Sequence, residues 1–305
     1  MKNIFIVNPH AGKTNALPAI KEILESKQDF QYEIYVTKSK GDATKFVASK
    51  CEESDEDVTF YSCGGDGTLN EVASGCVGHK NAILAVYPSG SGNDYVKYYG
   101  GKELFLDLDN LIYGSETKID VIQTGDKYAI NACHFGLDSA VAKTMNAVRH
   151  KKIIGGRNAY NTGVLAALFT ALKTKCKVIG DGEELNKDKI LLCTVANGKY
   201  VGGSYKSSPK SINDDGLMEV CLIRPVSIFK FIKFIKVYKS GEHLNNEKLQ
   251  KYIEYRRCKK VEIIGGQKNF AISLDGEVVD GERFEVNVLE KALRFIIPRG
   301  YEPKN

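Results

Sequence analysis

The chain has 305 residues, of which 43% are apolar and 27% charged, and its net charge is +5. These values are ordinary for a globular protein with room for two domains. Its eight cysteines form no C-x-x-C pair, which excludes the usual zinc and disulfide frameworks and predicts free thiols in a reducing cytosol.

The N-terminus, Met1-Lys2-Asn3, runs directly into the apolar stretch Ile4–Val7, without the regions of a signal peptide. No stretch approaches the roughly 18 apolar residues of a transmembrane helix. We therefore expect a soluble, cytoplasmic protein.

The first hundred residues alternate between strand and helix patterns, which predicts a parallel α/β sheet. The expected strands are Ile4–Val7, Gln31–Thr37, Val58–Tyr61 and Ala82–Tyr87, and the expected helices cover about 17–26, 41–51 and 69–76. Loops at 8–13, 63–68 and 88–95 each follow a strand, at the end where open α/β sheets bind ligands.

The loop Gly64-Gly65-Asp66-Gly67-Thr68 joins an expected strand to a helix for which Thr68 is a plausible N-cap. Its three glycines allow a ligand close to the main chain, and the free N–H groups at a helix start favour a phosphate. A carboxylate beside a phosphate calls for a cation, so Asp66 favours a Mg²⁺-nucleotide. A tight turn whose glycines serve geometry alone remains the alternative.

Beyond about residue 119, alternating β-type runs predict a second, mostly antiparallel domain. These runs are 118–123, 128–133, 190–197, 217–224, 260–264, 269–274 and 283–288. The run 269–274 leads into Asp275-Gly276-Glu277, where Asp-Gly is also a common hairpin turn. We expect domains at 1–120 and 121–290, and in 291–305 a strand, Leu293–Ile297, that returns to the first domain.

Two basic stretches suit contact with an anionic membrane. Residues 139–180 contain no Asp or Glu, and residues 228–239 form a cationic amphipathic helix pattern with three lysines opposite its apolar side. The alternatives are a basic loop without a partner and a helix that packs its apolar side on the protein. We expect no nucleic-acid binding, because the basic segment lacks clustered aromatics for base stacking.

Several motifs together resemble the diacylglycerol kinase catalytic family, which includes bacterial lipid kinases and the sphingosine and ceramide kinases. The resemblance covers nearly the whole chain. Its motifs are Asn8-Pro9-His10-Ala11-Gly12, Thr37 with Gly41-Asp42-Ala43, Gly64 to Glu71, Pro88 to Asp94, Asn131 with Gly136 and Asp138, Asn213 to Leu217, and Leu274 to Glu277.

The resemblance implies an N-terminal α/β domain with a parallel sheet, of the NAD kinase and diacylglycerol kinase type, followed by a C-terminal, mostly antiparallel β-sandwich. Between the two domains, the enzyme would use ATP for phosphorylating a lipid hydroxyl, most commonly that of diacylglycerol. The implied ATP-binding residues are Asn8, Pro9, Gly12, Thr37, Gly64, Gly65, Asp66, Gly67, Thr68, Asn70, Ser91 and Asn93. Ser91 stands where the family usually has threonine, and the hydroxyl is kept.

Acidic residues complete the implied site. Asp275 would be the general base for the substrate hydroxyl. Asp66, Asp94 and Asp120 would hold Mg²⁺ near the phosphates, since Mg²⁺ keeps several waters and needs few carboxylates. A structural Mg²⁺ would bind Asp215 and the carbonyls of Ile212 and Leu217.

Two other functions remain open on sequence grounds: an NAD kinase, which shares the Gly-Gly-Asp-Gly-Thr loop, and a non-catalytic lipid-binding protein on the same scaffold. The Gly-Ser-Gly-Asn-Asp and Leu-Asp-Gly-Glu segments favour the lipid kinase, and retention of Asp66, Asp94 and Asp275 argues against a mere binder. A homodimer through an edge of the β domain is left open.

Overall fold

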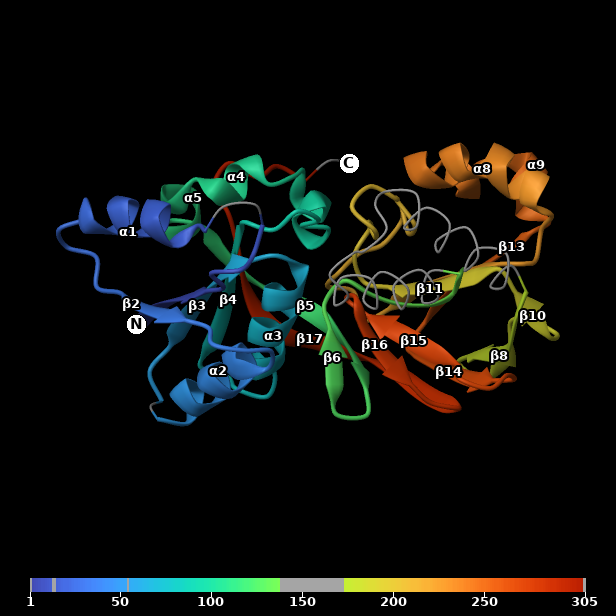
Figure 1. Cartoon of the computed structure of the whole chain (residues 1–305), viewed down its shortest axis with the longest axis horizontal. Coiled ribbons are helices and arrows are strands. Elements are labelled where there is room, and N and C mark those ends of the chain that lie inside the picture. Colours follow the sequence, from blue (N-terminus) through green and yellow to red (C-terminus); the bar gives the residue numbers. More distant parts are fainter. Residues whose placement is uncertain (1, 13–14, 54, 138–172, 304–305) are drawn as a thin grey trace, which may run out of the picture.

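The structure, a computed structural model, describes residues 2–12, 15–53, 55–137 and 173–303 (Figure 1). Asp138 and residues 139–172 of the acid-free segment lie outside the described residues. The elements, in chain order, are β1 Lys2–Val7, α1 Leu17–Glu25, β2 Glu33–Val36, α2 Asp42–Glu52, β3 Val58–Gly64, α3 Asp66–Cys76, β4 Ala82–Pro88, the 3-10 helix η1 Tyr95–Tyr99, α4 Glu103–Leu106, α5 Leu108–Ile112, β5 Ser115–Thr124, β6 Lys127–Ala129, β7 Ala132–Gly136, β8 Thr174–Gly180, β9 Glu183–Glu184, β10 Lys189–Ile190, β11 Leu192–Ala196, β12 Met218–Ile223, α8 Ile228–Ser240, η2 Glu242–Leu244, α9 Glu247–Gln250, β13 Ile253–Cys258, β14 Lys260–Gly265, β15 Ala271–Leu274, β16 Glu277–Asp280 and β17 Arg283–Ile297.

The first domain is built on the parallel strands β4, β3, β1 and β2, in that order across the sheet. Every residue of β3 and β4 is buried, as expected for apolar runs covered on both faces by helices. In Figure 1, α1, α4 and α5 lie on one face and α2 and α3 on the other. The predicted α/β class of this domain is confirmed.

The second domain is a sandwich of two antiparallel layers. One layer is the sheet β13-β12-β11-β7-β15-β16, and the other is the part of the larger sheet that contains β8, β14 and β17. Side chains such as Phe135, Val195 and Val220 from the first layer pack against Val178 and Ile263 from the second. This arrangement confirms the predicted β-sandwich.

Strand β17 belongs to both domains. It pairs antiparallel with β14 through residues 283–287 and with β5 through residues 287–297, and it pairs parallel with β4 at Arg294 and Phe295. The register shifts between Leu289 and Leu293, where Lys291 has a φ of 49°. The two strands expected at 283–288 and 293–297 are therefore one bulged strand, because the bulge turns the second half toward the core of the first domain.

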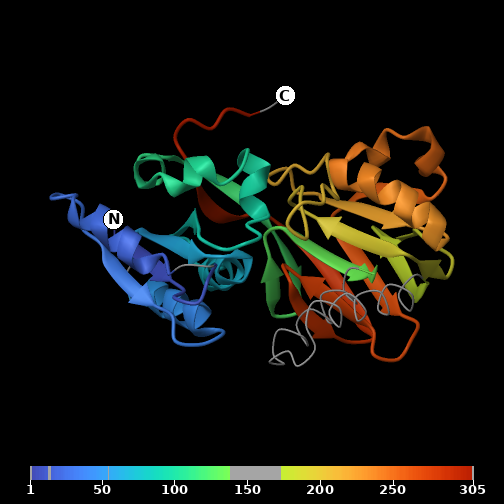
Figure 2. The ribbon, with the colours of Figure 1, turned by 45° about the horizontal axis from the view of Figure 1, so that its top comes forward.

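The chain also breaks where a single strand was expected at 128–133. β6 pairs with β5 of the large sheet, whereas β7 pairs with β11 and β15 of the six-stranded sheet. The residues between them, Ile130 and Asn131, change sheets and leave the ladder. Figures 1 and 2 show α3, β6 and β16 next to one another at this junction of the domains.

The helix expected within 228–239 is confirmed as α8, which lies over the six-stranded sheet (Figure 1). Its lysines 230, 233 and 236 are exposed, while Phe231, Phe234 and Ile235 are partly buried. Among the described residues, no helix combines the length and apolarity needed to cross a bilayer.

Candidate active site at the domain junction

Three loops of the first domain pack main chain against main chain at the carboxyl ends of β1, β3 and β4. A Cβ atom on Gly12 would lie 2.1 Å from the Ser89 carbonyl oxygen, and one on Gly90 would lie 2.3 Å from the Cα of Gly65. Both distances are too short for any side chain, so these glycines are required for the loops to meet. The structure thus brings the three predicted loops together at one edge of the sheet.

Helix α3 begins at Asp66, three residues earlier than predicted. Its N-cap is Gly65, which has no side chain to satisfy the first N–H groups, and Thr68 lies inside the helix as an acceptor for Asn8 Nδ2 at 3.0 Å. The expectation that Thr68 is the N-cap is therefore wrong. A Cβ atom on Gly67 would meet no atom of the described chain within 4 Å. The helix start is thus uncapped by a side chain and open, as an anion site requires.

Asp66 and Asp94 are neighbours beside this helix start. Asp66 Oδ1 accepts the main-chain N–H of Asp94 at 2.7 Å. Burial, followed by the charge of Asp94, raises the pKa of Asp66. A neighbouring negative charge that opposes the ionisation of Asp66 would be offset by a cation bound beside it. Asp94 itself pairs with Lys97 at 2.5 Å, so its charge is already partly compensated.

The remaining residues predicted for the nucleotide lie around the same loops. Asn93, with a φ of 49°, donates its side-chain amide to the Gly90 carbonyl at 2.7 Å, and Thr37 follows β2 with its N–H bonded to Val7. Pro9 is partly buried and Ser91 is exposed. The sequence did not single out Ser89, whose buried hydroxyl has no hydrogen-bond partner among the described residues. A buried hydroxyl without a partner, next to Gly12 and Gly90, is a signal only the fold reveals.

In the second domain, Asp275 occupies the turn between β15 and β16. Both Asp275 and Gly276 have positive φ angles, 46° and 90°, as in a type I′ hairpin turn. The interpretation of Asp275-Gly276 as a hairpin turn is therefore confirmed. The chain contains a second such turn at Asp181 and Gly182, with φ angles of 47° and 88°, whose carboxylate accepts the N–H groups of Lys259 and Lys260.

The surroundings of Asp275 differ from those of Asp181. Its carboxylate accepts the N–H groups of Ile130, Asn131 and Ala132 at 2.9, 3.2 and 2.8 Å, at the break between β6 and β7. Asn70 Nδ2, from α3 of the first domain, lies 3.3 Å from Asp275 Oδ2. Burial raises the pKa of Asp275 to about 6, although these donors oppose the shift. Asp275 is thus a carboxylate held at the domain junction and titrating near neutrality.

A second link crosses the junction beside Asp275. Glu277, at the start of β16, pairs with Lys40 of the first domain at 3.2 Å and with Lys127 of the β5–β6 hairpin at 3.4 Å. Asp275 and Glu277 therefore both contact the first domain. Neither lysine was singled out from the sequence, because an ion pair between elements so far apart in the chain leaves no local pattern.

The described hydrogen bonds of the Asp120 carboxylate do not involve Asp66 or Asp94. Its buried carboxylate accepts the N–H groups of Gly216 and Lys291, both at 2.7 Å, and the charges of Asp215 and Asp214 add to the effect of burial in raising its pKa. The structure therefore groups Asp120 with the loop 213–217. A role of Asp120 with Asp66 and Asp94 stays a prediction.

The residues predicted for a structural Mg²⁺ lie in the same loop. Asp215 pairs with Arg257, and its other oxygen accepts the N–H of Leu217 at 3.1 Å. Ile212 is 43% exposed. No group of three or more His, Cys, Asp or Glu side chains suited to a metal occurs in the described part of the chain. Asp215 is thus already paired with a cation, and a structural Mg²⁺ at Asp215 with the carbonyls of Ile212 and Leu217 stays a prediction.

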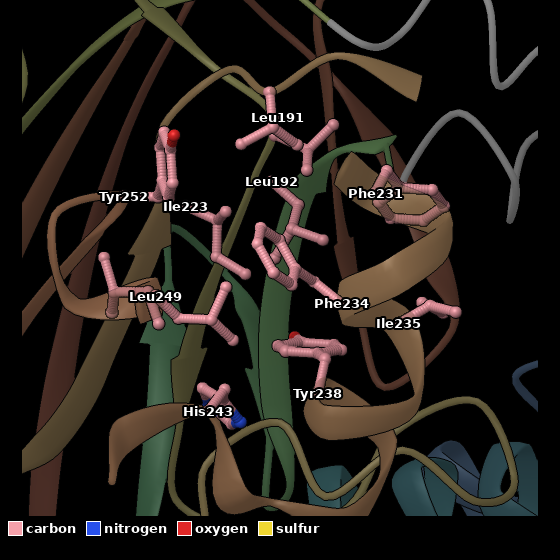
Figure 3. A pocket seen from close by; sticks show the side chains of 12 residues that line it. Leu191, Leu192, Ile223, Phe231, Phe234, Ile235, Tyr238, His243, Leu249 and Tyr252 are labelled. Carbon is pink, nitrogen blue, oxygen red and sulfur yellow. The ribbon is translucent and has the colours of Figure 1, made fainter. Parts of the chain in front are cut away.

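An apolar pocket lies between α8 and the six-stranded sheet (Figure 3). The cavity has a volume of about 30 Å³, within a wider hollow of about 420 Å³ that includes open solvent. Leu192 and Ile223 of the sheet face Phe231 and Phe234 of α8 across it (Figure 3), and other residues in its wall are Leu191, Val226, Ile235, Tyr238, His243, Leu249, Tyr252 and Ile253. The apolar side of α8 is thus turned toward the protein, which favours the packing alternative for this helix.

Comparisons with known proteins match both domains. Residues 2–124 match the family model of the diacylglycerol kinase catalytic domain, and residues 131–297 match that of the YegS C-terminal NAD kinase beta sandwich-like domain. A relative named "Diacylglycerol kinase" from Bacillus subtilis is 28% identical over 89% of this chain and 88% of its own length. A relative from Yersinia enterocolitica, named "Probable lipid kinase YegS-like", is 26% identical over 96% of this chain and 95% of its own.

Solved structures share the fold. The crystal structure of a diacylglycerol kinase from Bacillus anthracis matches with a TM-score of 0.71 at 19% identity, over 99% of this chain and 98% of that one. An NAD kinase from Archaeoglobus fulgidus in complex with ATP matches less closely, with a TM-score of 0.53 at 12% identity, over 97% of this chain and 94% of that one. The two-domain fold is therefore shared with both groups.

Proposed function

Because the chain belongs to the diacylglycerol kinase catalytic family, we propose that it is an ATP-dependent lipid kinase that converts diacylglycerol to phosphatidic acid. The observation that carries the proposal is the position of Asp275. Its carboxylate lies within hydrogen-bond reach of Asn70, on the helix that starts from the glycine-rich loop. A base from one domain and a phosphate loop from the other are the two halves of a phosphoryl-transfer site.

We assign the nucleotide phosphates to the uncapped start of α3. Gly67 leaves space there, and the first N–H groups of the helix have no side-chain cap. The buried Ser89 hydroxyl, which has no partner in the described part of the chain, supports a ligand between this helix and the loop after β4. The N–H groups and the helix dipole would stabilise negative charge. The other ATP-binding residues of the proposal are those that line these loops.

A Mg²⁺ ion bound with ATP would neutralise phosphate charge during transfer. Asp66 and Asp94 fit such an ion, because two neighbouring carboxylates, one of them with a raised pKa, are stabilised by a cation. We therefore assign Mg²⁺-ATP to these residues, with Lys97 holding Asp94 in place. Asp120 would join this site if its carboxylate, now bonded to the N–H groups of Gly216 and Lys291, reached the same ion through water.

Asp275 would accept the proton of the lipid hydroxyl. The hydroxyl oxygen forms a bond to the γ-phosphorus, the bond from that phosphorus to the bridging oxygen of ADP breaks, and the proton passes to a carboxylate oxygen of Asp275. Because its pKa is about 6, Asp275 is largely ionised at neutral pH and still basic enough to take the proton. The three N–H donors from 130–132 hold the carboxylate in place.

The apolar pocket supports a lipid acceptor. Its wall consists mostly of apolar and aromatic side chains, and the space within it is about 30 Å³, so an acyl chain would enter it as α8 moves away from the sheet. We assign an acyl chain of the substrate to it. Phe229, 77% exposed at the start of α8, and the exposed lysines of that helix would contact an anionic membrane. The protein would then be a cytoplasmic enzyme with peripheral membrane contact.

An assay with labelled ATP and a panel of acceptors tests this function. Diacylglycerol, sphingosine and ceramide are supplied in mixed micelles, and NAD is supplied in solution as the acceptor of the alternative, an NAD kinase. The proposal predicts label in phosphatidic acid and none in NADP. Transfer to NAD alone would establish the nucleotide kinase instead, and transfer to no acceptor would leave a non-catalytic binder.

A further inference from the structure

In the part of the chain that the structure describes, four hydrogen-bond donors approach the carboxylate of Asp275. An ionised carboxylate offers about four lone-pair positions. Oδ1 accepts the N–H groups of Ala132 at 2.8 Å and Asn131 at 3.2 Å, and Oδ2 accepts that of Ile130 at 2.9 Å and the amide of Asn70 at 3.3 Å. A substrate hydroxyl must therefore displace one of these donors before Asp275 can take its proton.

Three of the four donors are fixed. Ile130, Asn131 and Ala132 present main-chain N–H groups from the same domain as Asp275, and the Asp275 N–H in turn donates to the Ala132 carbonyl at 3.0 Å. The Asn131 carbonyl accepts the N–H groups of Asn197 and Gly198. Moving any of these donors would disturb the pairing between β7 and its neighbours.

Asn70 is the donor that can leave. Its distance of 3.3 Å from Asp275 is longer than the shortest contact of each main-chain donor. The amide is also a side chain, and it belongs to the other domain. The same Nδ2 atom donates its second hydrogen to the Tyr128 carbonyl at 2.8 Å. Asn70 can therefore release Asp275 and keep one hydrogen bond, which limits the cost of the exchange.

We propose that Asn70 is a positioning residue that caps Asp275 until the lipid hydroxyl takes its place. This inference rests on the proposed function and assigns Asn70 to the base, whereas the resemblance assigns it to ATP. Asn70 lies one helical turn after Asp66, so the cap is carried by the helix that binds the phosphates. Without lipid, the capped base does not activate water, and ATP is protected from hydrolysis.

Replacing the Asn70 amide should change both ATP hydrolysis and the pH profile of the enzyme. In Asn70→Ala, Asp275 Oδ2 is open to water, whose oxygen can bond to the γ-phosphorus as the bridging bond breaks and the proton passes to Asp275. ATP hydrolysis without lipid should therefore rise about tenfold relative to lipid phosphorylation. Loss of a donor to the ionised form also raises the pKa of Asp275, so the acidic limb of the kcat/KM profile should move up by about one pH unit.

Two further variants make the test decisive. Asn70→Asp keeps the shape of the side chain but places a carboxylate against Asp275, and it should move the acidic limb further than Asn70→Ala. If thermal melting shows that Asn70→Ala does not fold, Asn70→Asp alone tests the role of Asn70. Asn81→Ala is the control, because Asn81 also donates to a main-chain carbonyl of the first domain, that of Cys51 at 2.9 Å. Its hydrolysis ratio and pH profile should match those of the wild type.

The outcomes separate this inference from the proposed function. If the wild type phosphorylates no lipid, the proposed function fails. If the wild type is active and the Asn70 variants keep its hydrolysis ratio and acidic limb, only the role of Asn70 is overturned. A rise in the KM for ATP without a shift of the acidic limb would overturn it too, and would make Asn70 a nucleotide ligand.

Discussion

The Asp94 carboxylate in the first domain forms hydrogen bonds with the main chain of Gly203 in the second domain. Both carboxylate oxygens of Asp94 accept the Gly203 N–H, at 3.0 and 2.9 Å, while Lys97 donates to the Gly203 carbonyl at 2.5 Å. Gly203 has a φ of 80°, so a residue with a side chain is disfavoured there. The clamp fixes the loop 201–205 beside the carboxylates assigned to Mg²⁺-ATP.

Lys97→Met should destabilise this clamp. The Asp94 side chain is only 11% exposed, and losing its cation leaves a mostly buried charge without a counter-ion. We expect the free energy of unfolding in urea to fall by about 1–3 kcal/mol. Lys50→Met removes a lysine from the more exposed pair with Glu53 and should lower the free energy of unfolding clearly less than Lys97→Met does. Equal losses of unfolding free energy in the two variants would show that the clamp does not stabilise the protein.

Gly67→Ala separates nucleotide binding from folding. Apart from its chain neighbours and the backbone of its own helix, no described atom lies within 4 Å of the added methyl group, and alanine favours a helix over glycine by up to about 1 kcal/mol. Thermal stability should be kept or raised, while calorimetry should show ATP binding weakened about tenfold or more by the methyl group in the phosphate space. Gly90→Ala, which forces a clash with Gly65, should lower both. Unchanged ATP affinity in Gly67→Ala would place the nucleotide elsewhere.

The pH dependence of lipid phosphorylation should have its acidic limb near pH 6. Ionised Asp275 accepts the proton and protonated Asp275 does not, so activity rises with pH through the pKa of about 6. One unit below the pKa, kcat/KM should be about tenfold lower. The profile is measured with saturating Mg²⁺-ATP. Activity that stays level down to about pH 5 would contradict this assignment.

Glu219→Gln should stabilise the protein at alkaline pH. Glu219 is fully buried beside Arg257, and burial raises its pKa from 4.5 to about 7. Between these values the native state binds more protons than the unfolded state, so stability falls as pH rises and stays low above pH 7. The variant should gain on the order of 1 kcal/mol at about pH 8 and lose this dependence. A destabilised variant at about pH 8 would mean that the pairing with Arg257 outweighs burial.

Much of the fold follows from local patterns. The buried runs of β3 and β4 and the glycines after them are visible in the sequence, because periodicity and backbone freedom are local properties. The break at Ile130 and Asn131 is not, since the apolar run 128–133 continues through it and only the pairing of β6 and β7 with different strands reveals it. Yet this break supplies the N–H groups that hold Asp275.

The candidate site shows the same division. The motif order points to Asp275, but its contact with Asn70 spans 205 positions in the sequence and has no local signature. Asp120 was expected with Asp66 and Asp94 at a Mg²⁺ site, and no pattern in the sequence indicated that its carboxylate accepts the N–H groups of Gly216 and Lys291. The apolar side of α8 was readable as a pattern, but the pocket beneath it depends on packing.

The most direct test of the account compares Asp275→Asn with Asp181→Asn. Both residues occupy Asp-Gly turns with positive φ, and both carboxylates accept main-chain N–H groups, so Asp181→Asn controls for the loss of a carboxylate at such a turn. Phosphorylation of diacylglycerol with labelled ATP is measured for each, alongside ATP binding. We expect Asp275→Asn to lose activity by about 10²-fold or more while still binding ATP, and Asp181→Asn to stay near the wild type. Equal activity in both variants would contradict the role of Asp275 as the base.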